Sequence, residues 1–297
     1  MRTRKVGPLN VSVVGLGCNN FGRRVDENGT RAVVDAALEV GVTFFDTADV
    51  YGNRGGSETI LGEVLQDRRE QVVLATKFGS DMGDDATRRG SRDYVNRALE
   101  GSLRRLRTDV IDLYQHHQED PETPVEETVA ALDELVEQGR IRAYGTSNYQ
   151  PATLERAKAA AGPGYVSEQS EYSLLEREAE AELLPACRRL GLGFVPYFPL
   201  ASGLLAGKVS REAPPAEGTR LHGREIAAAE LDQVERLRAW AEARGVSLLE
   251  VAIGGLLAVD PIVSVIAGAT KPEQVRANAA AGAWEPGREE LAELLAL

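Results

Sequence analysis

The chain of 297 residues alternates between short runs rich in β-branched residues and longer segments whose apolar residues recur at helical spacing. Eight strand–helix pairs follow one another in this way, and no low-complexity linker separates them. Consecutive units of this kind place their strands in one parallel sheet with the helices outside it. The order therefore predicts an α/β fold, a closed (β/α)₈ TIM barrel that forms a single domain over residues 1–297. An open doubly wound sheet is the alternative.

Turn and capping residues place the expected elements along the chain. A short N-terminal hairpin is expected before the first strand. The strands are expected at 11–17, 42–46, 72–77, 110–117, 142–147, 165–169, 193–197 and 262–266. Two helices are expected in addition to the eight of the barrel, so that the helices fall at 30–41, 57–65, 91–106, 124–138, from 151, 176–191, 231–244, 247–258, 272–281 and 289–297. Thr30 and Ser57 are the expected N-caps of the first two helices.

The net charge of −12 argues against a nucleic-acid or anionic-membrane surface, because both need an excess of Lys and Arg. It leaves room for a local anion pocket made from backbone N–H groups and one or two cations. Cys18 and Cys187 form no metal-binding pattern, so we expect reduced thiols and no metal. The chain lacks a signal-peptide h-region and any apolar run of about 18 residues, so we expect a cytoplasmic protein, monomeric by default.

Two glycine-rich segments look like phosphate-binding motifs but lack required residues. Gly15-Leu-Gly-Cys-Asn-Asn20 has asparagine at the third glycine position of the Rossmann fingerprint. In Ser202-Gly-Leu-Leu-Ala-Gly-Lys-Val209, the first glycine is out of register for a Walker A motif and Val209 replaces Ser or Thr. We therefore reject the Rossmann dehydrogenase and the P-loop ATPase.

Polar residues lie at the carboxyl ends of the second, third and fourth expected strands. Asp46 ends one strand and Tyr51 follows five residues later, Lys77 ends the next strand, and His117 ends the one after that. Each alone is more often a structural or solvated residue, but the carboxyl ends of consecutive barrel strands meet at one rim. We therefore expect Asp46, Tyr51, Lys77 and His117 to form one site.

These four residues suit the reduction of a carbonyl group. A free tyrosine, with a pKa of about 10, is a weak acid at neutral pH. An ammonium ~4 Å from the phenol stabilises the phenolate by about 4 kcal/mol at an effective dielectric of ~20, before desolvation subtracts. We therefore expect Lys77 to lower the pKa of Tyr51, Asp46 to hold Lys77, and His117 to orient the carbonyl by a hydrogen bond.

The sequence resembles the aldo-keto reductase family over nearly its whole length. Seven ordered blocks carry the resemblance, namely 13–17, 44–52, 74–77, 112–117, 145–148, 169–172 and 199–208. The resemblance implies a barrel that binds NADP(H), or alternatively NAD(H), at its C-terminal rim and reduces aldehydes or ketones to alcohols. It implies Tyr51 as the proton donor, with Asp46, Lys77 and His117 completing a tetrad. An NADPH-binding sensor or regulatory subunit with little turnover, such as the potassium-channel β subunits of this family, is the alternative.

The resemblance also implies contacts to the cofactor, residue by residue. Ser147, Asn148 and Gln169 correspond to residues that bind the nicotinamide carboxamide, and Tyr197 corresponds to the residue that stacks on the ring. Gly17, Asn19 and Asp46 are further expected cofactor-binding residues. The pyrophosphate loop is expected to contribute Leu200, Ser202, Gly203, Lys208 and Arg220, and the adenosine 2′-phosphate region is expected to contribute Gly268, Thr270, Lys271, Gln274 and Asn278.

Three residues and one loop are expected to line the substrate pocket, namely Phe21, Phe78, Gln118 and residues 208–228. The sequence departs from the common family pattern at Phe198, where many members have serine, and at Gln274, where many have arginine. Both departures concern the cofactor site. The substrate contacts come from loops, so the sequence does not identify the carbonyl substrate.

Overall fold

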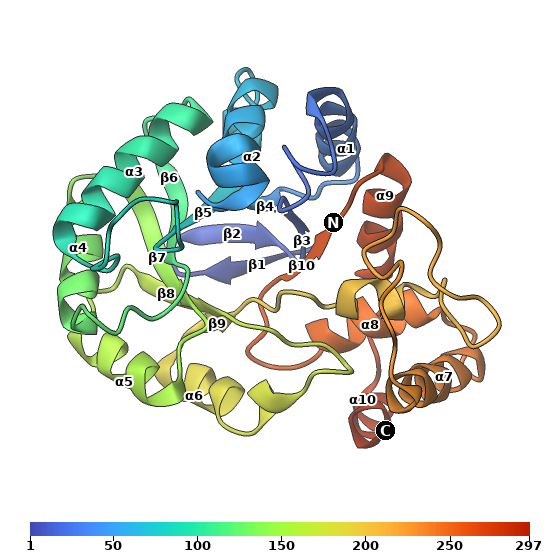
Figure 1. Cartoon of the computed structure of the whole chain (residues 1–297). Coiled ribbons are helices and arrows are strands. Elements are labelled where there is room, and N and C mark those ends of the chain that lie inside the picture. Colours follow the sequence, from blue (N-terminus) through green and yellow to red (C-terminus); the bar gives the residue numbers. More distant parts are fainter.

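The computed structural model describes residues 1–297, and its centre is a sheet of eight parallel strands. Neighbouring strands lie in the order β10–β3–β4–β5–β6–β7–β8–β9, with the helices around the outside (Figure 1). The strands are β3 (Val14–Gly17), β4 (Phe44–Asp46), β5 (Val73–Phe78), β6 (Ile111–His116), β7 (Ile141–Ser147), β8 (Tyr165–Gln169), β9 (Gly193–Phe194) and β10 (Val265–Gly268).

The two ends of the sheet meet through backbone hydrogen bonds. Phe194 N–H donates to Pro261 O at 3.0 Å, and Val263 N–H donates to Phe194 O at 2.9 Å. This contact joins β9 to the segment before β10, so the strands curl into the expected barrel rather than an open doubly wound sheet. Strand β9 is shorter than predicted, because Pro196 has no N–H to continue the ladder.

The helices cover the outer face of the strands, and α2 (Tyr51–Val64) lies between α1 and α3 (Figure 1). Helices α7 and α8 both fall between β9 and β10, and α10 follows α9, which gives the two extra helices. The other helices are α1 (Glu27–Glu39), α3 (Arg92–Leu106), α4 (Val125–Glu137), α5 (Pro151–Ala160), α6 (Leu183–Leu190), α7 (Ala228–Glu242), α8 (Leu248–Leu257), α9 (Pro272–Ala281) and α10 (Arg288–Ala296).

Helices α1 and α6 begin at other residues than predicted. Helix α1 begins one turn earlier than expected, because Asp26 caps it by accepting the Gly29 N–H at 2.8 Å, while Thr30 is buried inside the helix. The single helix expected over 176–191 consists of a 3₁₀ turn, Glu178–Glu180, followed by α6. Neither change alters the strand ends that carry the expected site.

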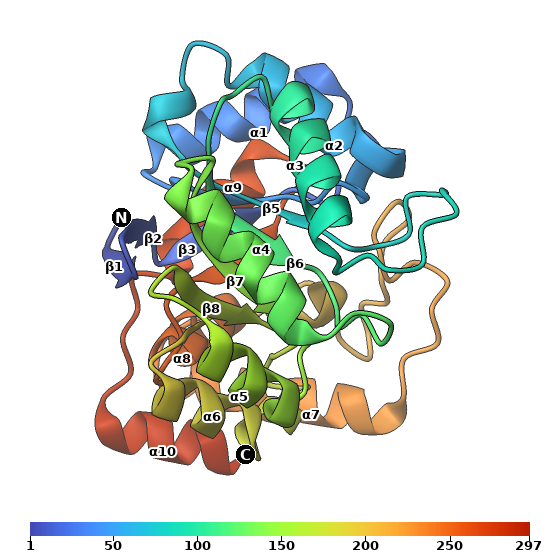
Figure 2. The same cartoon turned by 90° about the vertical axis from the view of Figure 1, so that its left-hand side faces the viewer.

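A hairpin closes one end of the barrel. Strands β1 (Thr3–Val6) and β2 (Leu9–Ser12) pair antiparallel, and Val6, Leu9 and Val11 pack with apolar side chains from the barrel strands. Each such buried side chain contributes roughly 1.5–3 kcal/mol. Figure 2 shows the hairpin at one end and the long connecting loops projecting at the other. The hairpin covers the amino ends of the strands, which leaves the carboxyl ends for function.

Cys18 and Cys187 are buried and unbridged. No group of three or more His, Cys, Asp and Glu side chains is arranged to hold a metal ion. None of the helices is both long and apolar enough to cross a membrane.

Candidate active site

The segment after β4 turns Tyr51 back toward the barrel. Although the segment is formally part of α2, Gly52, Asn53, Arg54 and Gly55 have positive φ angles of 66°, 61°, 68° and 110°, so regular helix begins only after them. A Cβ at Gly52 would lie 2.6 Å from the Phe21 carbonyl oxygen, so only glycine fits there. The sequence thus requires this glycine directly after the tyrosine.

Ser57 secures the same turn rather than capping a helix. Its hydroxyl donates to the Cys18 carbonyl at 2.9 Å and lies 2.8 Å from the Thr47 hydroxyl. The predicted role of Ser57 as an N-cap is therefore wrong, because its hydroxyl is used to hold the loops after β3 and β4 together. Ser57 therefore joins Thr47, the residue after Asp46, to the loop after β3.

Lys77 and Asp46 form an ion pair inside the barrel mouth. Lys77 Nζ donates to Asp46 Oδ2 at 2.5 Å and to the Thr47 carbonyl at 3.0 Å. The Lys77 side chain is fully buried, and that of Asp46 is 3% exposed. Burial opposes the charge on Lys77, but Asp46 and then Tyr51 outweigh it and raise the Lys77 pKa. The lysine is therefore a fixed ammonium.

Two amide side chains donate the remaining hydrogen bonds to the Asp46 carboxylate. Gln115 and Gln169 donate to Asp46 Oδ1 at 3.1 and 3.0 Å, so both carboxylate oxygens are occupied. Gln115 was missed from the sequence. It pairs with Lys77 across β5 and β6 and is two residues before His117, so the period-2 alternation of a strand could have identified it as facing inward.

Tyr51 lies beside this ion pair. Lys77 Nζ is 5.1 Å from the centre of the Tyr51 ring. Burial raises the Tyr51 pKa, and the opposing effect of the Lys77 charge is smaller, so the pKa lies above its ordinary value. The expectation that Lys77 lowers the pKa below that of a free tyrosine is therefore wrong for the ligand-free protein. Desolvation outweighs the Coulomb attraction.

His117 lies against the same tyrosine. The two rings meet edge-on with centres 5.7 Å apart. Burial, and then the charges of Lys77 and His116, lower the His117 pKa to about 3, so the imidazole is neutral at physiological pH. Nδ1 is buried without a partner, whereas Nε2 is not enclosed. A neutral imidazole can donate one hydrogen bond, and Nε2 is the nitrogen positioned to do so.

His116, the other member of the pair, belongs to the packing behind the site. Its ring stacks on Phe78 with centres 4.9 Å apart, and Nδ1 lies 2.7 Å from the Tyr149 hydroxyl. Adjacent residues of a strand point to opposite faces, which separates the two histidines. Of the two, only His117 lies beside Tyr51.

The residues expected to hold a nicotinamide lie together at the same rim. Ser147 pairs with Gln169 across β7 and β8. Asn148 Nδ2 donates to the His117 carbonyl at 3.0 Å, and the Tyr197 hydroxyl donates to Asn148 Oδ1 at 2.9 Å. Asn148 also has a positive φ of 59°, a conformation found preferentially at functional sites. Amide and hydroxyl groups of this kind fit a planar carboxamide.

The next loop offers backbone donors to an anion. Phe198, Ala201, Ser202 and Gly203 have positive φ angles of 53°, 46°, 60° and 115°. The N–H groups of Leu200 and Ser202 donate to no backbone carbonyl. Free N–H groups in such a turn form an anion-binding concavity. Lys208 is exposed just beyond it. The loop therefore fits a pyrophosphate.

The other residues expected to bind the cofactor lie beside the loop after β3 and around the start of α9. Arg220 donates to the Oδ1 atoms of Asn19 and Asn20 at 3.3 and 3.4 Å, which ties its loop to the one after β3. Across the sheet, Gly17 is paired with both Gly268 and Asp46. Thr270, Lys271, Gln274 and Asn278 follow at the start of α9 and in its first turns.

Two of the three expected pocket residues are enclosed. The side chains of Phe21 and Phe78 are fully buried, and Phe78 stacks on Tyr114 with centres 4.7 Å apart. They are therefore core residues and present no surface to a substrate in this structure. Gln118 is exposed. The aromatic group that is exposed at the mouth is Phe198, with the Arg220 guanidinium 5.3 Å from its ring centre.

Comparison with known proteins identifies the family of the chain. The model of the Aldo/keto reductase family matches residues 13–297. The chain belongs to the aldo/keto reductase family. It is 40% identical over 284 residues to the uncharacterized oxidoreductase YrpG of Bacillus subtilis (strain 168), which covers 90% of this chain and 86% of the relative.

Two further relatives bear on the function of this aldo/keto reductase. The structure resembles the holo form of the aldo-keto reductase AKR11C1 from Bacillus halodurans, with a TM-score of 0.83 and 35% identity, covering 99% of this chain and 96% of that one. A probable voltage-gated potassium channel subunit beta of Oryza sativa subsp. japonica is 36% identical over 91% of this chain and 87% of its own. Aldo/keto reductases are oxidoreductases that typically depend on NAD(P)H and act on small carbonyl compounds.

Proposed function

We propose that this aldo/keto reductase is an NADP(H)-dependent enzyme that reduces an aldehyde or ketone to an alcohol, with Tyr51 as the proton donor. The observation that carries the proposal is that Tyr51 lies beside both the Lys77 ammonium, 5.1 Å from its ring centre, and the neutral ring of His117, 5.7 Å away. The bound nicotinamide would supply the hydride. The residues described below would bind, orient and protonate the carbonyl.

Tyr51 would donate its phenolic proton to the oxygen that becomes the alcohol. Its raised pKa keeps the phenol protonated before the reaction. As the proton leaves, the buried Lys77 ammonium stabilises the developing phenolate, and the low local dielectric strengthens that effect. His117, being neutral, would donate a hydrogen bond from Nε2 to the same oxygen and fix its direction. Lys77 thus acts by stabilising the Tyr51 phenolate that proton transfer produces.

Asp46 would keep Lys77 charged and in place. Its two oxygens accept from Lys77, Gln115 and Gln169, so the carboxylate cannot turn toward Tyr51. A buried charge that is paired and hydrogen-bonded on all sides is a preorganised dipole, which is the form of electrostatic catalysis that needs no rearrangement during the reaction.

A sensor that binds NADPH with little turnover is the second candidate, because the rice relative is described as a probable channel subunit. The test is NADPH oxidation by the purified protein with 4-nitrobenzaldehyde and a broad panel of aldehydes and ketones. The reductase predicts multiple turnovers on at least one compound. Tight NADPH binding without turnover on the whole panel would favour the sensor.

A further inference from the structure

A cavity of about 650 Å³ lies between the loop after β3 and the start of α9. Arg23 and Arg24 line it on one side, and Thr270 lines it on the other. It is separate from the Tyr51 site, and the residues expected to bind the cofactor include only Thr270 from its lining. The two arginines therefore have no assigned role.

The acidic residues of this cavity are already engaged. Asp26 accepts the Gly29 N–H at 2.8 Å as the cap of α1, and Glu27 pairs with Arg31 at 3.4 Å. Arg24 donates to the Gly218 carbonyl at 2.5 Å, and Arg23 makes neither a hydrogen bond nor an ion pair through its side chain. In a chain with 46 acidic and 34 basic residues, two neighbouring arginines without a carboxylate partner indicate a site for an external anion.

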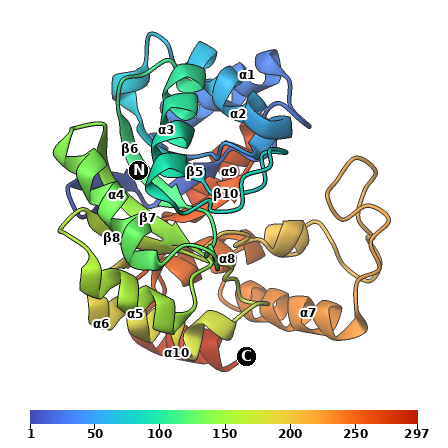
Figure 3. The same ribbon diagram turned by 60° about the vertical axis from the view of Figure 1, so that its left-hand side comes forward.

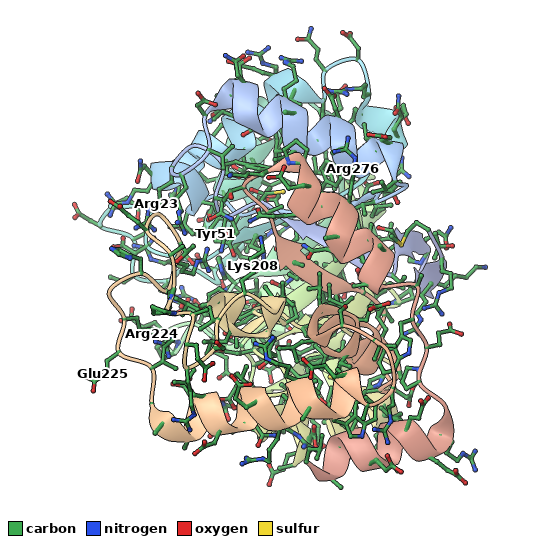
Figure 4. The ribbon with its side chains drawn as sticks, turned by 90° about the vertical axis from the view of Figure 1, so that its right-hand side faces the viewer. Arg23, Tyr51, Lys208, Arg224, Glu225 and Arg276 are labelled. Carbon is green, nitrogen blue, oxygen red and sulfur yellow. The ribbon has the colours of Figure 1, made fainter.

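A third guanidinium adds to this concentration of charge. Burial, together with the nearby charges of Arg24 and Arg23, lowers the pKa of Arg220. Like charges at close range cost free energy, and a bound anion would offset that cost. Figure 4 shows Arg23 at the edge of the molecule where the loop carrying Arg224 passes, whereas Arg276 lies on α9, well separated from it. Figure 3 shows how far this loop, which precedes α7, extends from the barrel.

The opposite wall has fewer free donors than the sequence suggested. Gln274 Oε1 accepts from Thr270 N at 2.7 Å, from the Thr270 hydroxyl at 3.1 Å and from Lys271 N at 3.2 Å. The glutamine thus occupies the amides that a helix start would otherwise offer to a phosphate. An anion beside Thr270 would have to find its remaining donors across the cavity.

We propose that Arg23 and Arg24 bind a phosphate monoester across this cavity from Thr270, and that its source is the adenosine 2′-phosphate of NADP(H). The inference rests on the proposed function. Arginine matches phosphate geometry with paired N–H groups, and a phosphate monoester carries about −1.5 to −2 charges at pH 7. The two arginines would then be the main determinants of NADPH over NADH, taking the role that arginine has in many relatives at the position of Gln274.

The test measures the affinity of the full-length protein for four nucleotides by calorimetry. NADPH is compared with NADH, and 2′,5′-ADP with 5′-AMP, because each pair differs only in the 2′-phosphate. The variants are Arg23→Gln, Arg24→Gln and the double variant. Arg276→Gln is the matched control, because it makes the same change of charge on α9 but removes a pair with Glu39 on α1. Thermal melting checks that each variant is folded.

The double variant is expected to lose ~10-fold or more in affinity for NADPH and 2′,5′-ADP and to keep its affinity for NADH and 5′-AMP, with Arg276→Gln unchanged. Arg23→Gln removes no side-chain hydrogen bond or ion pair within the protein, so a selective loss there is not explained by the loss of a bond that holds the loop. Equal losses for both nucleotides of a pair would overturn the proposal. So would unchanged NADPH affinity combined with a higher KM for phosphorylated or carboxylated aldehydes, which would place the anion on the substrate. Wild-type protein that binds neither NADPH nor NADH would instead contradict the proposed function.

Discussion

The ammonium of Lys77 lies 5.1 Å from the centre of the Tyr51 ring, and the lysine is fully buried. Burial raises the tyrosine pKa, and the lysine limits the rise. The lysine therefore acts less by making the free phenol acidic than by stabilising the phenolate as it forms. This distinction determines what its removal should do.

Lys77→Met should reduce kcat by ~100-fold or more while changing the NADPH dissociation constant little, because it removes the charge that stabilises the phenolate and leaves an isosteric apolar chain. Steady-state kinetics at pH 7 and fluorescence titration with NADPH measure the two effects separately. A normal rate at neutral pH would refute the role of the lysine. Asp46 loses its counter-ion in this variant, so a melting curve must accompany the kinetics.

Glu168→Gln should make stability less dependent on pH. Glu168 is fully buried, with Tyr149 N–H and the Ser170 hydroxyl donating to it at 3.2 and 2.8 Å, and burial raises its pKa from 4.5 to about 7. The folded state therefore holds a proton that the unfolded state loses above pH ~4.5, and stability falls as the pH rises from there through about 7. The full difference is on the order of 3 kcal/mol.

Urea unfolding of wild type and Glu168→Gln at several values between pH 5 and 8 checks this prediction. The variant should lose less stability across the range. Asp49, whose pKa burial also raises to about 7, remains titratable in it, so some decline should persist. Parallel curves for the two proteins would show that Glu168 does not titrate there.

Lys271→Ala should lower the preference for NADPH over NADH by a few-fold at most. Its side chain is exposed at the start of α9, where a cation interacts with a phosphate through solvent and is partly screened. The ratio of kcat/KM values for the two cofactors measures the effect. If the ratio is unchanged, Lys271 takes no part in recognising the 2′-phosphate.

The barrel and the tetrad were predictable because both depend on local patterns. A β-branched run marks each strand, and the topology brings residues at or just beyond the carboxyl ends of the strands together, as for Asp46, Lys77 and His117. Gln115 was missed because the alternation of the strand places it on the same face as His117 but does not show that it binds Asp46. The balance between burial and charge at Tyr51 also depends on how completely the chain encloses it, which no sequence pattern reports.

The loops were less predictable for a related reason. Phe21 and Phe78 were expected in the pocket, but each fills core space instead. The bond from Gln274 to the amides of Thr270 and Lys271 depends on a rotamer, and the cavity beside Arg23 depends on how two distant loops meet. Such contacts arise only when the tertiary structure is complete.

Tyr51 has the proposed role of proton donor in an NADP(H)-dependent carbonyl reduction. The most direct measurement is single-turnover oxidation of bound NADPH by Tyr51→Phe, using a carbonyl compound that the wild type reduces. Removing only the hydroxyl should abolish turnover and leave the NADPH dissociation constant nearly unchanged, because Asp46, Lys77 and the cofactor residues keep their contacts. Reduction by Tyr51→Phe at a rate close to wild type would contradict the account.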